Sequence, residues 1–135
     1  RLSPFLRSGM DLFAELSPET TALKLCHNDL NHSNFVSGNN LFILDWEYAS
    51  LNDPYFDLAT IIEYHQLSDS KIEEFINHYS QNSESIDIKK LDQWRQLTDY
   101  LSIFWLMMLE KYATMSGKEK AWMINLEKRL SKKKG

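Results

Sequence analysis

The residues best suited to chemistry lie in one polar stretch and at one aspartate further along the chain. The stretch reads His-Asn-Asp-Leu-Asn-His-Ser-Asn, in which Asn34 follows Asp29 by five residues and precedes Asp45 by eleven. Phosphoryl transfer from a nucleotide needs a carboxylate that takes or orients the proton of the acceptor hydroxyl, and oxygen ligands that hold Mg²⁺ on the phosphates. We therefore expect Asp29 to be the base, with Asn34 and Asp45 as magnesium ligands.

A small β-structure is expected to bring these three side chains together. An apolar run before the polar stretch predicts a strand, and two further apolar runs flank a turn of Ser, Gly, Asn and Asn. The predicted strands occupy residues 23–26, 35–36 and 41–44, with the turn at 37–40. The last two strands form a β-hairpin whose second strand reads as buried, and Asp45 lies at its exit.

Most of the remaining chain has helical periodicity. Helices are predicted at about residues 3–16, 55–66, 69–80, 88–113 and 118–130. We expect an interruption or kink near Gly9 in the first helix, and Gly117 to separate the last two. The predicted fold class is α+β, mainly helical, with one small catalytic hairpin.

Composition narrows the class of protein. A chain of 135 residues with 43% apolar content predicts one globular unit over residues 1–135. A net charge of -4 argues against a nucleic-acid partner, because binding the phosphate backbone needs a basic face. No signal peptide and no membrane-length apolar stretch are found, so we expect a cytoplasmic location. The single cysteine, Cys26, allows no internal disulfide and is interpreted as a small buried side chain.

These motifs, taken together, resemble a known family. The segments that carry the resemblance are 25–34, Leu-Asp-Trp-Glu-Tyr at 44–48, Asn-Asp-Pro at 52–54 and Phe-Asp-Leu-Ala at 56–59. They look like the choline/ethanolamine kinase family, and most like its bacterial choline kinases. That family belongs to the aminoglycoside-phosphotransferase-like group, which shares the protein-kinase fold. The resemblance is strong over about residues 23–63.

The resemblance implies an activity and a set of roles. It implies transfer of a phosphoryl group from ATP to a small alcohol, with Asp29 as the catalytic base and Asn34 and Asp45 as Mg²⁺ ligands. It also implies that His27 and Asp57 support the backbone of the catalytic loop.

A second implication concerns the extent of the chain. The family carries a glycine-rich phosphate loop and a strand lysine in an N-terminal lobe, and neither is found in this sequence. The sequence also begins at Arg1, without a methionine. We therefore expect residues 1–135 to be the C-terminal, catalytic lobe of a kinase without its nucleotide lobe, weakly active or inactive alone.

The acceptor is expected to be choline-like. A quaternary ammonium cannot donate a hydrogen bond, so its site is built from aromatic faces with carboxylates nearby. The resemblance assigns Trp105 and Glu63 to such a site, with Tyr48 and Trp122 as further candidates, although aromatic residues at helical spacing also suit a core. Ser102 stands where the family has another tryptophan. Ethanolamine, thiamine or an aminoglycoside stay open as acceptors, as does a non-catalytic binding protein that keeps the fold.

Overall fold

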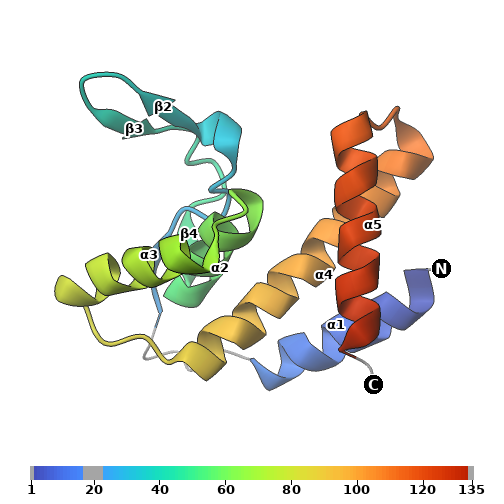
Figure 1. Ribbon diagram of the computed structural model, residues 1–135, viewed down its shortest axis with the longest axis horizontal. Coiled ribbons are helices and arrows are strands. Elements are labelled where there is room, and N and C mark those ends of the chain that lie inside the picture. The colour runs from blue at the N-terminus through green and yellow to red at the C-terminus, as the bar shows by residue number, and fades with distance from the viewer. Residues whose placement is uncertain (1, 17–22, 134–135) are drawn as a thin grey trace. The chain divides into compact units, whose positions relative to one another are not determined.

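The computed structural model describes residues 2–16 and 23–133 (Figure 1). Its elements are mostly helices, with two small antiparallel pairs of strands, which confirms the predicted fold class. In chain order they are α1 (Leu2–Glu15), β1 (Lys24–Cys26), the 3₁₀ turn η2 (His32–Asn34), β2 (Phe35–Ser37), β3 (Leu41–Ile43), β4 (Ser50–Asn52), α2 (Pro54–Tyr64), α3 (Asp69–Gln81), α4 (Ile88–Tyr112) and α5 (Gly117–Lys132). None of the helices in these two ranges is long and apolar enough to cross a membrane.

The chain divides into two compact units. The helical unit comprises residues 1–17 and 96–135, the hairpin unit comprises residues 18–95, and α4 contributes to both. Buried side chains of α4, α5 and their connection form the core of the helical unit: Tyr100, Ile103, Leu106, Met115, Met123, Leu126 and Leu130. The hairpin unit has a smaller core around Leu58, Ile62 and Leu91. The polar stretch and Asp45 lie in the hairpin unit.

The strands form two separate pairs. β2 pairs with β3 in the predicted hairpin, with Phe35 opposite Ile43. β1 was also predicted, but its partner was not: β4 runs antiparallel to it, with Cys26 opposite Ser50. The three residues of β4 are too few to show an alternating apolar pattern, so β4 is recognised only through its pairing with β1.

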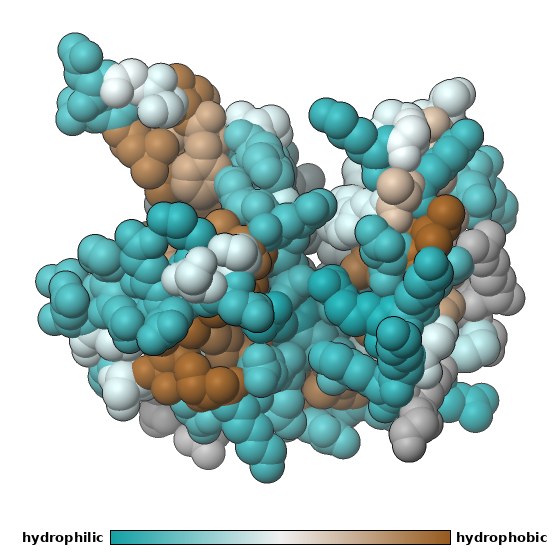
Figure 2. Space-filling model, viewed as in Figure 1, coloured by the Kyte–Doolittle hydropathy of each residue, from teal (hydrophilic) through white to brown (hydrophobic). Residues whose placement is uncertain are grey.

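The expectation that the second hairpin strand is buried is wrong. Leu41 and Phe42 are 63% and 55% exposed, and Ile43 and Leu44 are 37% and 47% exposed. Figure 2 shows the hydrophobic surface that gathers over β2 and β3. A run of four apolar residues predicts a strand, but its neighbours in space decide whether that strand is covered.

Local capping sets where the later helices begin. Asp53 caps α2 by accepting a hydrogen bond from the backbone N–H of Tyr55 (3.0 Å), and Pro54 occupies the first turn. Lys90 forms an ion pair with the second oxygen of the buried Asp53 (2.7 Å), which ties α4 to this cap. Ser116 caps α5 in a capping box with Glu119. Each predicted helix begins and ends within two residues of the observed bounds.

Gly9 lies inside an uninterrupted α1, so the expected interruption is wrong. A Cβ atom at this position would lie 3.2 Å from Cβ of Tyr100 and 3.3 Å from the ring of Phe104. The glycine therefore serves the close packing of α1 on α4.

Candidate active site

Asp57 fixes the backbone where β1 passes into the polar stretch. Its carboxylate lies in the first turn of α2 and accepts hydrogen bonds from the backbone N–H groups of His27 (2.7 Å) and Asn28 (2.9 Å). Asn28 has φ 68°, in the left-handed region that asparagine tolerates better than most residues. The two bonds hold the chain at a conformation that few side chains adopt.

His27 joins the polar stretch to the end of the hairpin. Its Nδ1 accepts the backbone N–H of Asp29 (3.2 Å), and its Nε2 lies 2.7 Å from the carbonyl oxygen of Leu44. A carbonyl can only accept and an N–H can only donate, so this pair of partners selects the neutral ring with its proton on Nε2. Trp46 packs edge-on against the ring at 4.7 Å. His27, which is 2% exposed, is thus a structural link between the loop and the residue before Asp45.

Asn28 extends the link to β4. Its side-chain amide donates to the carbonyl oxygen of Tyr48 and to Oγ of Ser50, both at 2.8 Å. Its own oxygen accepts from the side chain of Asn52 at 3.0 Å. The segment that carries Asp45 is therefore bonded to the loop both before and after that residue.

Two asparagines orient the carboxylate of Asp29. Asn31 donates to one carboxylate oxygen (2.9 Å), and Asn34 donates to the other (3.1 Å) and to the backbone oxygen (2.7 Å). Asn31 also accepts the backbone N–H of Ser33, which caps the 3₁₀ turn. A carboxylate held on both oxygens points in one defined direction, as a general base requires.

The donor set at Asn34 and Asp45 suits Mg²⁺. The amide nitrogen of the buried Asn34 is used by Asp29, which leaves its amide oxygen as the atom for a cation. The backbone N–H of Leu44 donates to the carbonyl oxygen of Asn34 (2.8 Å), so Asp45 directly follows a residue bonded to Asn34. Asp45 is exposed and has φ 60°. Amide and carboxylate oxygens are the ligands that Mg²⁺ takes.

The described parts of the chain hold no group of three or more His, Cys, Asp or Glu side chains arranged for a metal. The Asn34 and Asp45 pair is of another kind, because Mg²⁺ usually takes only one or two protein oxygens and keeps waters and substrate phosphates as its other ligands.

The remaining predicted residues lie in different settings. Glu63 is buried on α2 and forms an ion pair with Nε of Arg95 at 2.5 Å, so its charge is already compensated. Tyr48 is 60% exposed in the hairpin unit. Trp105 is 53% exposed on α4, and Trp122 packs against the core; both belong to the helical unit.

Cys26 lies at the end of β1, directly before the loop, and is 2% exposed, which confirms its interpretation as a buried side chain. Burial, and then the negative charges of Asp57 and Asp53, raise its pKa to about 11. The group is therefore a neutral thiol at physiological pH and no nucleophile.

Four residues whose side chains join the hydrogen-bond network were not predicted as site residues: Asn28, Asn31, Ser50 and Asn52. Three of them are asparagines, like Asn34, and the concentration of this residue type over residues 28–52 was the available indication. Asparagine offers both donor and acceptor atoms and tolerates the left-handed conformation, which suits a tightly folded polar loop.

Comparison with known proteins gives matches over most of the chain. Residues 5–95 match the phosphotransferase enzyme family. Protein LicA of Haemophilus influenzae is 36% identical over 113 residues, which cover 78% of this chain and 42% of that protein. The crystal structure of choline kinase LicA from Streptococcus pneumoniae is 26% identical with a TM-score of 0.71, over 97% of this chain and 45% of that one. A structure of LicA in complex with AMP is 25% identical with a TM-score of 0.72, over 97% and 46%. The chain thus spans less than half the length of these relatives.

Proposed function

The chain belongs to the phosphotransferase enzyme family, and we propose that it carries the catalytic part of a kinase that transfers the γ-phosphoryl group of ATP to the hydroxyl of a small alcohol. One observation carries the proposal. The loop of Asp29 and Asn34 is hydrogen-bonded to the backbone of Leu44, the residue before Asp45, through both His27 and the carbonyl oxygen of Asn34. A base and two oxygen ligands thus come from one rigid, hydrogen-bonded substructure.

Asp29 is the base of the proposed reaction. Its carboxylate, oriented by Asn31 and Asn34, accepts the proton of the acceptor hydroxyl as that oxygen bonds to the γ-phosphorus of ATP, and the bond from this phosphorus to the bridging oxygen breaks, so that ADP leaves. The remaining residues of the loop bind and orient: His27 and Asp57 keep the backbone in place, and neither touches the reacting atoms.

Asn34 and Asp45 would hold Mg²⁺ through their side-chain oxygens. When bound with the nucleotide, the ion would neutralise charge on the phosphoryl group that is transferred.

We further propose that residues 1–135 correspond to the C-terminal, catalytic lobe of the kinase. The exposed apolar side chains of β3 and of Val36 support this, because such a patch is the kind of surface that another part of a protein or a ligand covers. A nucleotide lobe and the base of ATP would cover it in the complete enzyme. The structure of a relative with AMP bound is consistent with a nucleotide substrate.

Choline is the proposed acceptor, because relatives that cover nearly the whole chain are described as choline kinase. Trp105 is the aromatic face proposed for the quaternary ammonium, with Tyr48 and Trp122 as further candidates. Glu63 stays the carboxylate proposed for the acceptor site, and in this structure it is paired with Arg95. Ethanolamine or another small alcohol is the competing acceptor, and a panel of alcohols separates them by kcat/KM.

The test of the base uses the complete gene product that contains this chain. Asp29→Asn is expected to lower kcat by at least about a hundredfold with little change in the KM for ATP, because it removes the base with little change in side-chain size. Asp69→Asn, an exposed acidic residue at the start of α3, is the matched control and should keep wild-type turnover. Equal kcat values in wild type and Asp29→Asn would refute the assignment.

A second variant tests the assignment of Asp45 as a ligand of Mg²⁺. Asp45→Ala is expected to raise the Mg²⁺ concentration needed for half-maximal activity and to weaken the binding of Mg-ATP, measured by titration calorimetry. An unchanged requirement for Mg²⁺ would exclude Asp45 as a ligand.

A further inference from the structure

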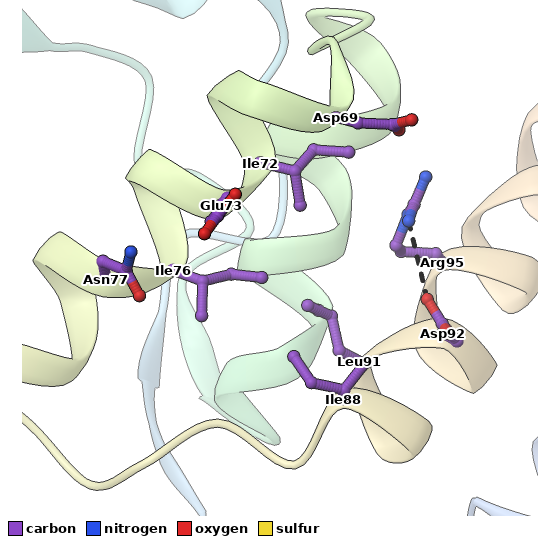
Figure 3. A pocket seen from close by; sticks show the side chains of 9 residues that line it. All are labelled: Asp69, Ile72, Glu73, Ile76, Asn77, Ile88, Leu91, Asp92 and Arg95. Atoms are coloured by element: carbon purple, nitrogen blue, oxygen red, sulfur yellow. Dashed lines mark hydrogen bonds and ion pairs between the residues drawn. The ribbon is translucent and has the colours of Figure 1, made fainter.

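A groove lies between α3 and the start of α4, entirely within the hairpin unit (Figure 3). Its volume is about 320 Å³. Ile72 and Ile76, one turn apart on α3, face Ile88 and Leu91 on α4 across the groove. Figure 2 shows hydrophobic surface in this region, between α3 and the beginning of α4.

Acidic side chains edge the apolar walls. Asp69 and Glu73 lie on the α3 side and Asp92 lies on the α4 side. The groove has one cationic lining residue, Arg95, and its guanidinium is bound to the buried Glu63 and lies 3.5 Å from Asp92. Arg95 thus pairs with Asp92 as well as with Glu63, and the charges of Asp69 and Glu73 keep the α3 side of the rim negative.

The apolar side of α3 is incompletely covered by the hairpin unit itself. The helix has no buried residue along its 13 positions, although Ile72, Phe75, Ile76 and Tyr79 pack against the core from one side. Ile88 on the facing helix is 55% exposed. The apolar stripe of α3 is therefore only half-buried, which leaves apolar surface that another element can cover.

We propose that this groove binds an amphipathic helix, rich in lysine or arginine, that belongs to a partner protein. The chemistry of both surfaces points to this occupant. Two helices with an apolar floor between them accept the ridge of a third helix, and its apolar side chains at i, i+3 and i+4 would reach the isoleucines. Basic residues beside that ridge would meet Asp69, Glu73 and Asp92.

The size of the groove fits a short helix. The lining positions of α3 run from Asp69 to Asn77, which corresponds to about 12 Å along the helix axis. That length accommodates about two turns of a bound helix, so the partner segment contributes two or three apolar anchors. The proposal does not depend on the phosphotransferase reaction, because the lining residues lie outside the network of His27, Asp29 and Asp57, and only Arg95 contacts a residue proposed for the acceptor site, Glu63.

The test measures binding of a defined peptide to the intact chain. The probe is a fluorescein-labelled leucine and lysine peptide of about 14 residues, with leucines at helical spacing, followed by fluorescence anisotropy at physiological salt. A peptide with glutamate in place of lysine is the matched probe. We expect saturable binding of the lysine peptide with a Kd below about 100 μM, and none of the glutamate peptide.

Two pairs of variants locate the site. Glu73→Lys combined with Asp92→Asn reverses the rim and is expected to weaken binding about tenfold. Asp11→Asn combined with Glu84→Lys makes the same change in net charge at exposed positions outside the groove and should leave the affinity within about twofold.

A second pair of variants tests the apolar contact between the peptide and the groove. Ile88→Ser is expected to weaken peptide binding about fivefold, because it removes an anchor contact. Ile124→Ser, at a similarly exposed isoleucine on α5 (49%), should have no effect. Both isoleucines are about half exposed, so circular dichroism should show wild-type folding for both variants.

The outcomes decide the proposal. Weakening in both groove variants and in neither control supports it. Equal weakening by the control charge variant would mean general attraction to an acidic chain and would overturn it, as would unchanged affinity in both groove variants or the absence of binding. Binding of octylammonium that depends on Glu73 and Asp92, without binding of the peptide, would assign the groove to a small organic cation instead.

Discussion

Asp57→Ala tests whether one carboxylate holds the candidate catalytic loop in place. The substitution removes the acceptor of two backbone N–H groups, those of His27 and Asn28. His27 is buried, so its N–H would be left without a partner in a site that water reaches poorly. Asn28 would lose the bond that holds its left-handed conformation.

The expected cost follows from the two bonds. A hydrogen bond to a charged group contributes about 1.5–3 kcal/mol, and the lower value applies here because Asp57 is only half-buried. Two such bonds give about 3 kcal/mol, a change of more than a hundredfold in the unfolding equilibrium of the hairpin unit. That is a large fraction of the stability of an ordinary domain, which is about 5–15 kcal/mol.

Asp69→Ala is the matched control. Asp69 also lies in the first turn of a helix, but it is exposed, and α3 has no side-chain capping bond. Its loss removes only the favourable interaction with the helix dipole, which is below about 1 kcal/mol. Both variants replace aspartate by alanine near a helix N-terminus, so the difference in helix propensity cancels in the comparison.

The assay combines urea unfolding with amide hydrogen exchange. Urea unfolding measures the free energy of unfolding for wild type and both variants, and hydrogen exchange reports directly on the N–H groups of His27 and Asn28. We expect Asp57→Ala to lower the free energy by about 2 kcal/mol more than Asp69→Ala and to abolish protection at both N–H groups. Equal losses in the two variants, with protection unchanged, would refute the role given to Asp57.

Two further predictions concern reactivity and packing. The pKa of Cys26 is raised to about 11, so the folded chain should react with iodoacetamide at pH 8 at least roughly a hundredfold more slowly than the urea-unfolded chain. The reaction of the folded chain should become faster as the pH approaches 11. Equal rates for the folded and unfolded chains at pH 8 would contradict a buried thiol. Gly9→Val should destabilise the helical unit by about 1–3 kcal/mol, since a Cβ there meets Tyr100 at 3.2 Å. Gly9→Ala should raise the free energy of unfolding by less than the approximately 1 kcal/mol expected from helix propensity alone. A full gain of that size, measured by thermal unfolding, would show that α1 can move away from α4 to make room for the Cβ atom.

Much of the local structure follows from short-range patterns. The turn residues at 37–40 predicted the β2–β3 hairpin, and the proline after Asp53 predicted the start of α2, because caps and turns depend on neighbours a few residues away. The polar stretch was likewise visible as a group of residue types at fixed spacing, and its resemblance to a kinase family agrees with the family match over residues 5–95.

Contacts between distant positions were not predictable in the same way. The pairing of β1 with β4 and the ion pair of Glu63 with Arg95 join residues that are tens of positions apart. Neither contact changes the local pattern of apolar and polar residues, so the periodicity of the sequence does not predict it. The exposure of Leu41 is a similar case, because only the path of the whole chain decides what lies above the strand.

The sequence by itself determined which atoms are available: a carboxylate at Asp29, an amide at Asn34, a carboxylate at Asp45, and turns that keep all three near one hairpin. Tertiary structure decided how they are held. Asp57 reaches the loop across 30 positions, and His27 reaches Leu44 across 17. A hydrogen bond forms only when the donor and acceptor atoms are about 3 Å apart, so only folding, which brings distant positions of the chain close in space, can form these bonds.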